Sequence, residues 1–309
     1  MSLRSVANQL SMRMRTSIFF GLVLLAAFGC GPAVPEDNAW DETDFSQAEL
    51  AYPGEEGTPR RGIIDVEGVA TVVDLIEISG ELVLDGDLIL PPEMVTLLEP
   101  RDENEDDVEL GESSQPLAAR RQAALWPKGV VFYKLADKLS ATMKQRIRDA
   151  MTHWENKTPI RFVVHTDQPD WVLFTTGAGC SATIGRAGGK QHVNVNSKCT
   201  KGNIIHEIGH TVGLWHEQSR TDRAEHVQIR WKNIMDGMRF NFQTYVQQGF
   251  DGRNVGAYDI KSVMHYGSFA FSRNGKPTIV RSNGSTFDAT RVLSDRDVAG
   301  VKKIYDPLL

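Results

Sequence analysis

Three histidines lie close together in the stretch NIIHEIGHTVGLWHEQSRTDR (203–223) of a chain that has eight histidines in all. His206 and His210 are four residues apart, so on a helix their side chains lie on one face, with Cβ atoms about 5–6 Å apart. That spacing lets both imidazoles bind one Zn²⁺ at about 2.0–2.1 Å. Glu207 is close enough to reach a metal-bound water without binding the metal itself. These residue types predict a zinc site with a general base beside it.

Gly213 indicates how a third histidine would reach the same metal. A glycine one turn after His210 can adopt a positive φ, end the helix and redirect the chain so that His216 returns to the site. Three neutral imidazoles leave one coordination position open, as in catalytic zinc sites, whereas structural sites are closed. The ion lowers the pKa of its bound water to about 7, and Glu207 takes the proton. A helix with two unrelated histidines is the alternative interpretation of HExxH alone.

The extended pattern HEIGHTVGLWH is that of the metzincin peptidases. Together with the following EQSRTDR it resembles the astacin family, whose pattern HExxHxxGxxHExxRxDR is matched at every fixed position. Those positions are His206, Glu207, His210, Gly213, His216, Glu217, Arg220, Asp222 and Arg223. Zincins that take a downstream carboxylate as third ligand would not need His216. The resemblance covers roughly Trp126 to Tyr305 and implies a secreted endopeptidase, with one Zn²⁺ per catalytic domain, that hydrolyses peptide bonds of proteins.

A second signature, SVMHY at 262–266, resembles the astacin Met-turn. The resemblance implies that Met264 forms the hydrophobic base beneath the zinc. It also implies that Tyr266 is a displaceable zinc ligand whose hydroxyl stabilises the tetrahedral intermediate. Without the resemblance these residues would be a core methionine and a packing aromatic. Glu217 would, by the same resemblance, bind the new N-terminus after activation, and His265 is expected to be structural.

The elements that position these residues begin near Trp126. A strand-like run at 130–135 precedes a helix whose N-cap is Ser140, and further runs follow at 161–165, 171–175 and 192–196. A helix from about Asn203 carries His206 and His210. A last helix begins near Ser294. The resemblance implies an α+β, zincin-like metzincin domain over 117–309. It would have a twisted, mostly parallel sheet with the active-site helix above, and a loop-rich lower half with the C-terminal helix.

A strongly acidic segment precedes this domain. Residues 36–115 contain 24 acidic against 3 basic side chains, whereas 116–309 contain 16 against 28. This asymmetry favours an acidic propeptide on a basic domain over two independently solvated surfaces. Within the acidic segment, 63–90 alternates apolar and acidic residues, and turn signals at Ser79-Gly80 and Asp85-Gly86 predict strands joined by tight turns.

Leu84-Asp85-Gly86-Asp87 resembles the F-x-G-D motif of astacin propeptides, with leucine in place of the aromatic residue. The resemblance implies that Asp87 binds the zinc in the zymogen and displaces the catalytic water. An ordinary Asp-Gly hairpin turn is the alternative. Activation would require a cut between 115 and 123, where Arg120-Arg121 is a trypsin-like site for an activating protease. Counting back from Trp126 instead puts the first residue of the mature domain near Leu117.

The N-terminus has the features of an export signal. Arg13 and Arg15 precede the apolar run 18–29, which is too short to span a bilayer comfortably. Cys30 lies where a bacterial lipoprotein signal places its lipidated cysteine; a simple cleaved signal is the alternative. We therefore predict a signal peptide at 1–30, a linker and acidic propeptide at 31–116, and an extracytoplasmic, secreted or envelope-attached enzyme. A lipid anchor on Cys30 would be its contact with a membrane.

Export permits disulfides. Cys180 and Cys199 predict one bridge, worth about 3 kcal/mol in the loop-entropy picture, with two buried free thiols as the alternative. The resemblance implies the same pair, and the family's usual second disulfide has no cysteines here. Expected partners are protein or peptide substrates, and no nucleic-acid signature is present. The competing function is an envelope lipoprotein that binds a partner and keeps zinc for structure, but such a site would not need Glu207.

Overall fold

The computed structural model describes residues 57–66, 69–98, 125–250 and 252–309. The chain divides into two units, 1–41 and 42–309, and every described residue belongs to the second. The predicted signal peptide, Cys30, the charged stretch 101–115 and the candidate cleavage site Arg120-Arg121 lie outside the described residues. Among the described residues, no helix is both long and apolar enough to cross a membrane.

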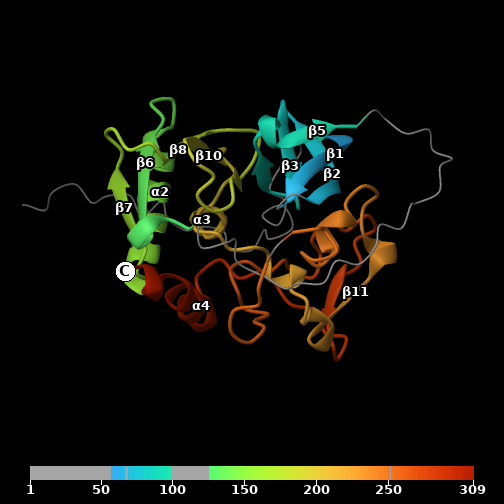
Figure 1. Cartoon of the computed structure of the whole chain (residues 1–309). Helices are drawn as coiled ribbons and strands as arrows, with labels where there is room; N and C mark the ends of the chain where they lie inside the picture. Colours follow the sequence, from blue (N-terminus) through green and yellow to red (C-terminus); the bar gives the residue numbers. More distant parts are fainter. Residues whose placement is uncertain (1–56, 67–68, 99–124, 251) are drawn as a thin grey trace, which may run out of the picture. The chain divides into compact units, whose positions relative to one another are not determined.

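Ten strands of the described residues form one mixed sheet, in the order β5-β1-β2-β3-β4-β9-β10-β8-β6-β7 (Figure 1). The second half of this order belongs to the domain after Trp126, with β6 (Val130–Leu135), β7 (Arg161–Val164), β8 (Trp171–Thr176), β9 (Ser181–Ala182) and β10 (Lys190–Val195). All of these pair in parallel except β9, which runs antiparallel to β10. The predicted mostly parallel sheet is confirmed for this domain.

The first half of the sheet comes from residues 57–66 and 69–98, which we call the hairpin segment. Its strands are β1 (Thr58–Val66), β2 (Val69–Ile78), β3 (Glu81–Leu84), β4 (Leu88–Leu90) and β5 (Val95–Leu97), all paired antiparallel. The predicted turns are confirmed, with φ of 53° at Ser79 and 50° at Asp85, each followed by a glycine with positive φ. β4 lies parallel to β9, with Leu88 opposite Ala182, so the hairpin segment extends the sheet of the following domain.

A shared apolar cluster holds the hairpin segment against the domain. Leucines of β3 and β4 pack with the aromatic side chains of Trp215, Phe240, Tyr245 and Phe250. Leu84, Leu88 and Tyr245 have no exposed surface. The hairpin segment is therefore bound through a common core as well as through the sheet.

Helix α2 (Ala141–Lys157) begins at the predicted cap, where the Ser140 hydroxyl accepts a hydrogen bond from the backbone N–H of Met143 at 3.1 Å. Its buried face carries the predicted apolar positions, Met143, Ile147, Met151 and Trp154. The indole N–H of Trp154 donates to the carbonyl of Ile205 at 3.0 Å. This contact joins α2 to α3.

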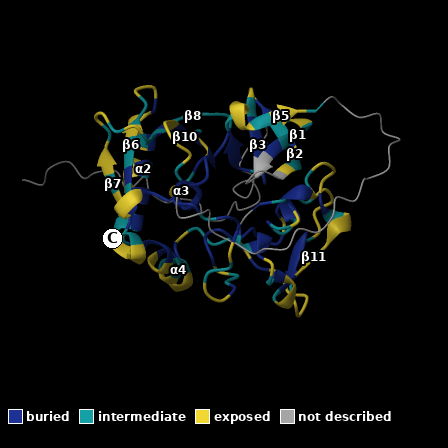
Figure 2. Cartoon of the chain, viewed as in Figure 1, coloured by how far each residue is buried: buried dark blue, intermediate teal, exposed yellow. Residues whose placement is uncertain are grey.

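Helix α3 (Lys201–Thr211) begins two residues before the predicted start, because Thr200 and Asn203 form a capping box. It is buried from Gly202 to its end (Figure 2). Gly213 has a φ of 95°, and the N–H of Leu214 donates to the carbonyl of Gly209 at 2.9 Å. The chain leaves the helix at this point, since a left-handed residue there interrupts the α-helical path.

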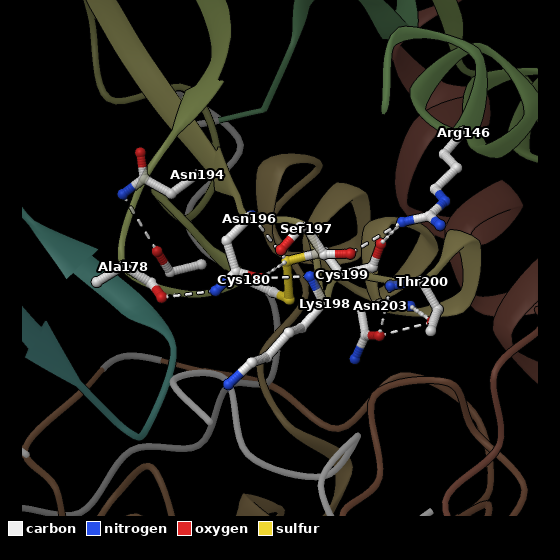
Figure 3. Close-up of a disulfide and its surroundings, with 11 residues drawn as sticks. Arg146, Ala178, Cys180, Asn194, Asn196, Ser197, Lys198, Cys199, Thr200 and Asn203 are labelled. Carbon is white, nitrogen blue, oxygen red and sulfur yellow. Dashed lines mark hydrogen bonds between the residues drawn. A yellow bond between two sulfur atoms is a disulfide. The ribbon is translucent and has the colours of Figure 1, made fainter. Parts of the chain in front are cut away.

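The predicted bridge between Cys180 and Cys199 is present, immediately before the Thr200 cap of α3 (Figure 3). The side-chain amide of Asn196 donates to the carbonyl of Ala178 at 2.6 Å, which ties together the two loops that carry the cysteines. Arg146 of α2 donates to the carbonyl of Cys199 at 3.0 Å. The start of α3 is thereby fixed to the sheet and to α2.

The C-terminal half is loop-rich, as predicted. It contains the two-stranded sheet β11 (Val227–Ile229) and β12 (Ile279–Arg281), and ends in α4 (Asp295–Tyr305), whose N-cap is Ser294. Across the described residues there are also short 3-10 helices: η1 (Pro92–Met94), η3 (Pro127–Gly129), η4 (Glu217–Ser219), η5 (Arg223–Glu225), η6 (Trp231–Asn233), η7 (Phe240–Phe242) and η8 (Asp306–Leu308).

Packing and hydrogen bonds join the two ends of the domain where a second disulfide is missing. The hydroxyl of Tyr305 donates to the carbonyl of Val212 at 2.9 Å, and the indole of Trp126 donates to the carbonyl of Thr211, also at 2.9 Å. Both aromatic side chains are almost completely buried. The first and last elements of the domain therefore meet at the C-terminal end of α3.

Candidate active site

Three imidazoles and one carboxylate converge at the end of α3. Nε2 of His206 lies 3.1 Å from Nε2 of His210 and 3.2 Å from Nε2 of His216. Oδ2 of Asp87 is 3.2 Å from Nε2 of His206 and 3.3 Å from Nε2 of His216, while Oδ1 is 3.4 Å from Nε2 of His210. All four residues are buried. The structure thus brings together the three predicted histidine ligands and Asp87, which is more than a hundred residues earlier in the chain.

The hydrogen-bond partner of Nδ1 shows which ring nitrogen of His206 and His210 is free to bind a metal. Nδ1 of His206 faces the carbonyl of Val263 at 2.7 Å, and Nδ1 of His210 faces the carbonyl of Leu214 at 2.8 Å. Because a carbonyl only accepts, each Nδ1 carries the proton and each Nε2 keeps its lone pair. Several lone pairs aimed at one point are unfavourable without a cation. Ligand atoms of a tetrahedral Zn²⁺ are about 3.3 Å apart, so the observed spacing fits this ion.

The electrostatics of the cluster favour a positive charge at its centre. Burial opposes ionisation of Asp87, but the facing imidazoles, His216 first, outweigh burial and hold the pKa of its carboxyl well below the ordinary range. Burial likewise opposes the charged form of His216, but Asp87 and Asp85 raise the pKa of His216 to about 10. Burial lowers the pKa of His206 to about 4. A bound divalent cation would balance the negative charge of Asp87 and Asp85. It would also leave the imidazoles neutral, as metal ligation requires.

Glu207 lies beside the cluster and is 2% exposed. Its Oε2 makes no hydrogen bond, and burial, followed by the negative charge of Asp87, raises the pKa of its carboxyl well above the ordinary value. The side chain lines a pocket of about 30 Å³ together with His206, Tyr266 and Arg291. A buried carboxyl group without a hydrogen bond for one oxygen, next to a pocket, is suited to accept a proton.

The residues of the SVMHY turn lie directly under α3. Met264 is 2% exposed, and a Cβ at Gly209 would collide with its Sδ, so the glycine permits this close approach. The Tyr266 hydroxyl donates to the backbone carbonyl of Asp85 at 2.7 Å, and its ring centroid is 4.6 Å from that of His216. His265 instead pairs with the hydroxyl of Tyr258 at 2.6 Å, a structural contact.

Glu217 lies away from the imidazoles, at a second pocket of about 50 Å³. Its Oε1 accepts from the backbone N–H of Asp259 at 2.8 Å and lies 3.3 Å from the Arg220 guanidinium. Burial raises the pKa of Glu217 to about 7. Asp259 and Asp297 also line the pocket, together with Arg220 and Arg296. Its three carboxylates therefore outnumber its two guanidinium groups, and the charge balance suits a cationic group.

Sequence reasoning missed Asp85 and Gln248. Oδ2 of Asp85 lies 2.8 Å from Nδ1 of His216, and Nε2 of Gln248 donates to Oδ1 of Asp85 at 3.2 Å. In the sequence, Asp85 has the features of an ordinary first residue of an Asp-Gly turn, and Gln248 belongs to no motif. No local pattern would have separated either from a structural residue.

Comparisons with known proteins agree with this geometry. Residues 118–306 match the family described as Astacin (Peptidase family M12A). The chain is 41% identical over 187 residues to zinc metalloproteinase nas-14 of Caenorhabditis elegans, covering 59% of this chain and 37% of that protein. It is 38% identical over 194 residues to nas-6 of the same organism, covering 61% and 56%. The chain thus spans just over a third of the length of the first of these relatives and just over half of the second.

Among solved structures, the chain is similar to high choriolytic enzyme 1, a hatching-enzyme zinc protease from Oryzias latipes. The TM-score is 0.57 at 30% identity, and the match covers 62% of this chain and 99% of that one. The match therefore accounts for nearly the whole length of the fish enzyme.

Proposed function

Since this chain belongs to the astacin family, peptidase family M12A, we propose that it is a zinc-dependent endopeptidase made as a latent zymogen. One observation carries the proposal: three imidazole Nε2 atoms converge beside a buried carboxylate, Glu207, whose Oε2 has no hydrogen bond. His206, His210 and His216 would hold the zinc. Proteins or peptides are the substrates that this chemistry fits.

In the mechanism, bound zinc would polarise the scissile carbonyl and lower the pKa of the attacking water. Glu207 takes the proton of that water and delivers it to the leaving amine. Burial raises the pKa of the Glu207 carboxyl, and a raised pKa makes a carboxylate a stronger proton acceptor. The Tyr266 hydroxyl donates to the oxyanion that the carbonyl oxygen becomes when water attacks the carbonyl carbon. The carbonyls of Val263 and Leu214 keep two of the imidazoles in the required tautomer.

Latency follows from the hairpin segment, which acts as the propeptide. The carboxylate of Asp87 contacts all three imidazoles, and the Tyr266 hydroxyl is engaged by the Asp85 carbonyl. These contacts support a zymogen in which Asp87 takes the position of the catalytic water. Cleavage before the domain would release the segment, and Glu217 in its pocket would then receive the new N-terminal ammonium group.

Export fits the disulfide between Cys180 and Cys199, because such bonds persist in oxidising compartments. The signal peptide at 1–30 and the lipid anchor on Cys30 remain predictions. The curated relatives reported above are animal proteins, and they lend no support to a bacterial lipoprotein. Secretion is therefore the part of this prediction that we retain as a proposal.

The test is a casein digest by the proteolytically activated protein, with and without a zinc chelator. We expect hydrolysis that the chelator abolishes and added zinc restores. Glu207→Gln should keep a full complement of zinc while its turnover falls by about 10²–10⁴-fold, the usual contribution of a general base. Undiminished turnover of Glu207→Gln would exclude the mechanism. No hydrolysis by any activated form would favour the competing function, a binding domain with a structural zinc.

A further inference from the structure

The carboxylate of Asp85 occupies a buried site built by the following domain. Oδ2 lies 2.8 Å from Nδ1 of His216, and Oδ1 accepts from Nε2 of Gln248 at 3.2 Å. Asp85 and Gln248 are each 1% exposed, and His216 is fully buried. The Gln248 amide nitrogen also donates to the carbonyl of Phe240 at 3.0 Å. Since both of its neighbours are acceptors, the amide must point its nitrogen toward Asp85.

The backbone of the turn holds this carboxylate in place. Asp85 and Gly86 have φ of 50° and 88°, so the chain reverses between β3 and β4 at this point. The Asp85 carbonyl accepts from the Tyr266 hydroxyl at 2.7 Å. A Cβ at Gly86 would meet the ring of Phe271 and the hydroxyl of Tyr266, each at 2.8 Å. The turn therefore fits closely against the site, and Asp85 is bound by both its side chain and its backbone.

His216 differs from the other two imidazoles in the origin of its Nδ1 partner. His206 and His210 use backbone carbonyls of Val263 and Leu214, which belong to the same domain and stay there after activation. The partner of His216 is a side chain 131 residues away, in the hairpin segment. When the hairpin segment is released, this partner leaves with it.

We propose that Asp85 is a positioning residue for the third zinc ligand: it orients His216 and strengthens it as a ligand only while the hairpin segment is bound. A carboxylate that accepts the Nδ1 proton fixes the tautomer of the imidazole and increases the basicity of Nε2, and losing such a partner typically costs 10–100-fold in metal affinity. The zymogen accordingly holds zinc more tightly than the mature domain. This inference rests on the proposed zinc site, but it gives Asp85 a role separate from that of Asp87.

The test measures the rate of zinc release into a chromogenic chelator from the full chain. A Glu207→Gln background prevents self-cleavage during the measurement. Asp85→Gly removes the carboxylate without backbone strain, because glycine accepts a positive φ. We expect release to be about 10-fold faster or more. Asp85→Asn tolerates the same φ and keeps one acceptor oxygen for Nδ1 of His216. It lacks the negative charge and the second acceptor oxygen, so it should release zinc at a rate between those of the parent and of Asp85→Gly.

Ser79→Gly is the matched control, since Ser79 has a φ of 53° in the other tight turn of the hairpin segment and is exposed. It should leave zinc release unchanged. Cleavage that removes the hairpin segment turns all these variants into the same domain, so their release rates must become equal. A difference that persisted after cleavage would show misfolding and overturn the proposal, as would unchanged release from Asp85→Gly.

A double variant separates Asp85 from Asp87. If Asp85 acted only by holding Asp87 in place, Asp85→Gly would add nothing in an Asp87→Ala chain; we expect it to accelerate release there as well. Latency is read separately, as peptide hydrolysis by Asp87→Ala with Glu207 intact. If Asp87→Ala hydrolyses peptide before cleavage but Asp85→Gly does not change zinc release, latency by Asp87 is supported and the positioning role of Asp85 is rejected. If Asp87→Ala is inactive but Asp85→Gly releases zinc faster, latency by Asp87 is rejected and the positioning role is supported.

Discussion

The hydroxyl of Tyr266 donates a hydrogen bond to the backbone carbonyl of Asp85, 2.7 Å away and 181 residues earlier in the chain. A peptide carbonyl of the hairpin segment therefore engages the group that the proposed mechanism needs for the oxyanion. The same residue, Asp85, contacts His216 through its side chain. In the proposed zymogen, inhibition would therefore act on the oxyanion donor as well as on the metal ligands.

Tyr266→Phe should reduce kcat of the activated enzyme by about 10²–10³-fold, the usual cost of removing one oxyanion donor. KM and zinc content should change little, because Phe keeps the ring that packs against His216. Steady-state kinetics with a peptide substrate and metal analysis measure these quantities. An unchanged kcat would remove Tyr266 from the mechanism.

Asp87→Ala in the full chain should produce hydrolysis before any activating cleavage. The substitution removes the carboxylate that contacts the three imidazoles and so frees the site for water. Glu93→Ala, an exposed acidic residue of η1 in the same segment, is the matched control and should stay latent. Peptide hydrolysis is measured together with N-terminal sequencing, to confirm that the active chain is uncut. If uncut Asp87→Ala is as inactive as the parent, Asp87 does not maintain latency.

The stability of the full chain should depend on pH through Glu217. Its pKa is about 7 in the fold against 4.5 ordinarily, so between these values the folded state binds more protons than the unfolded state. The contribution of Glu217 to the free energy of unfolding is therefore fully present below pH 4.5. It is lost as pH rises through 7, which lowers this free energy by about 3 kcal/mol. Glu217→Gln should match the parent at acidic pH and exceed its free energy of unfolding above pH 7.

Denaturant unfolding across this pH range makes the comparison. The activated protein supplies the control, because an N-terminal ammonium group beside Glu217 would favour the carboxylate and lower its pKa. Glu217→Gln should then destabilise the activated protein at neutral pH. The same effect of the substitution in both forms would argue against binding of the new N-terminus at Glu217.

Replacing both Cys180 and Cys199 by alanine should lower the free energy of unfolding by about 3 kcal/mol, from loss of the constraint on the unfolded chain. The bridge immediately precedes the cap of α3, so zinc content should also fall if the helix start loosens. The oxidised parent is compared with the reduced parent and with the double variant by denaturant unfolding. Equal stability of the parent with and without reductant would show that the bridge contributes nothing.

Several features followed directly from the sequence because their causes are local. The positions of His206 and His210 on one helix face depend only on the helical repeat. The caps at Ser140 and Ser294 depend on a hydroxyl that accepts from an N–H three residues later. Gly213 was predicted to end α3 because glycine adopts a positive φ without strain. The turns at Ser79 and Asp85 were predicted from their Gly neighbours for the same reason.

The sequence by itself determined which side chains could form a zinc peptidase site, since ligand type and spacing within a dozen residues are properties of the local chain. Only the tertiary structure decided that β4 pairs with β9 and that Asp85, rather than a backbone carbonyl, lies beside Nδ1 of His216. Such contacts join residues more than a hundred positions apart. They arise because leucines of the hairpin segment share a core with Trp215 and Phe240, and no local periodicity records that packing.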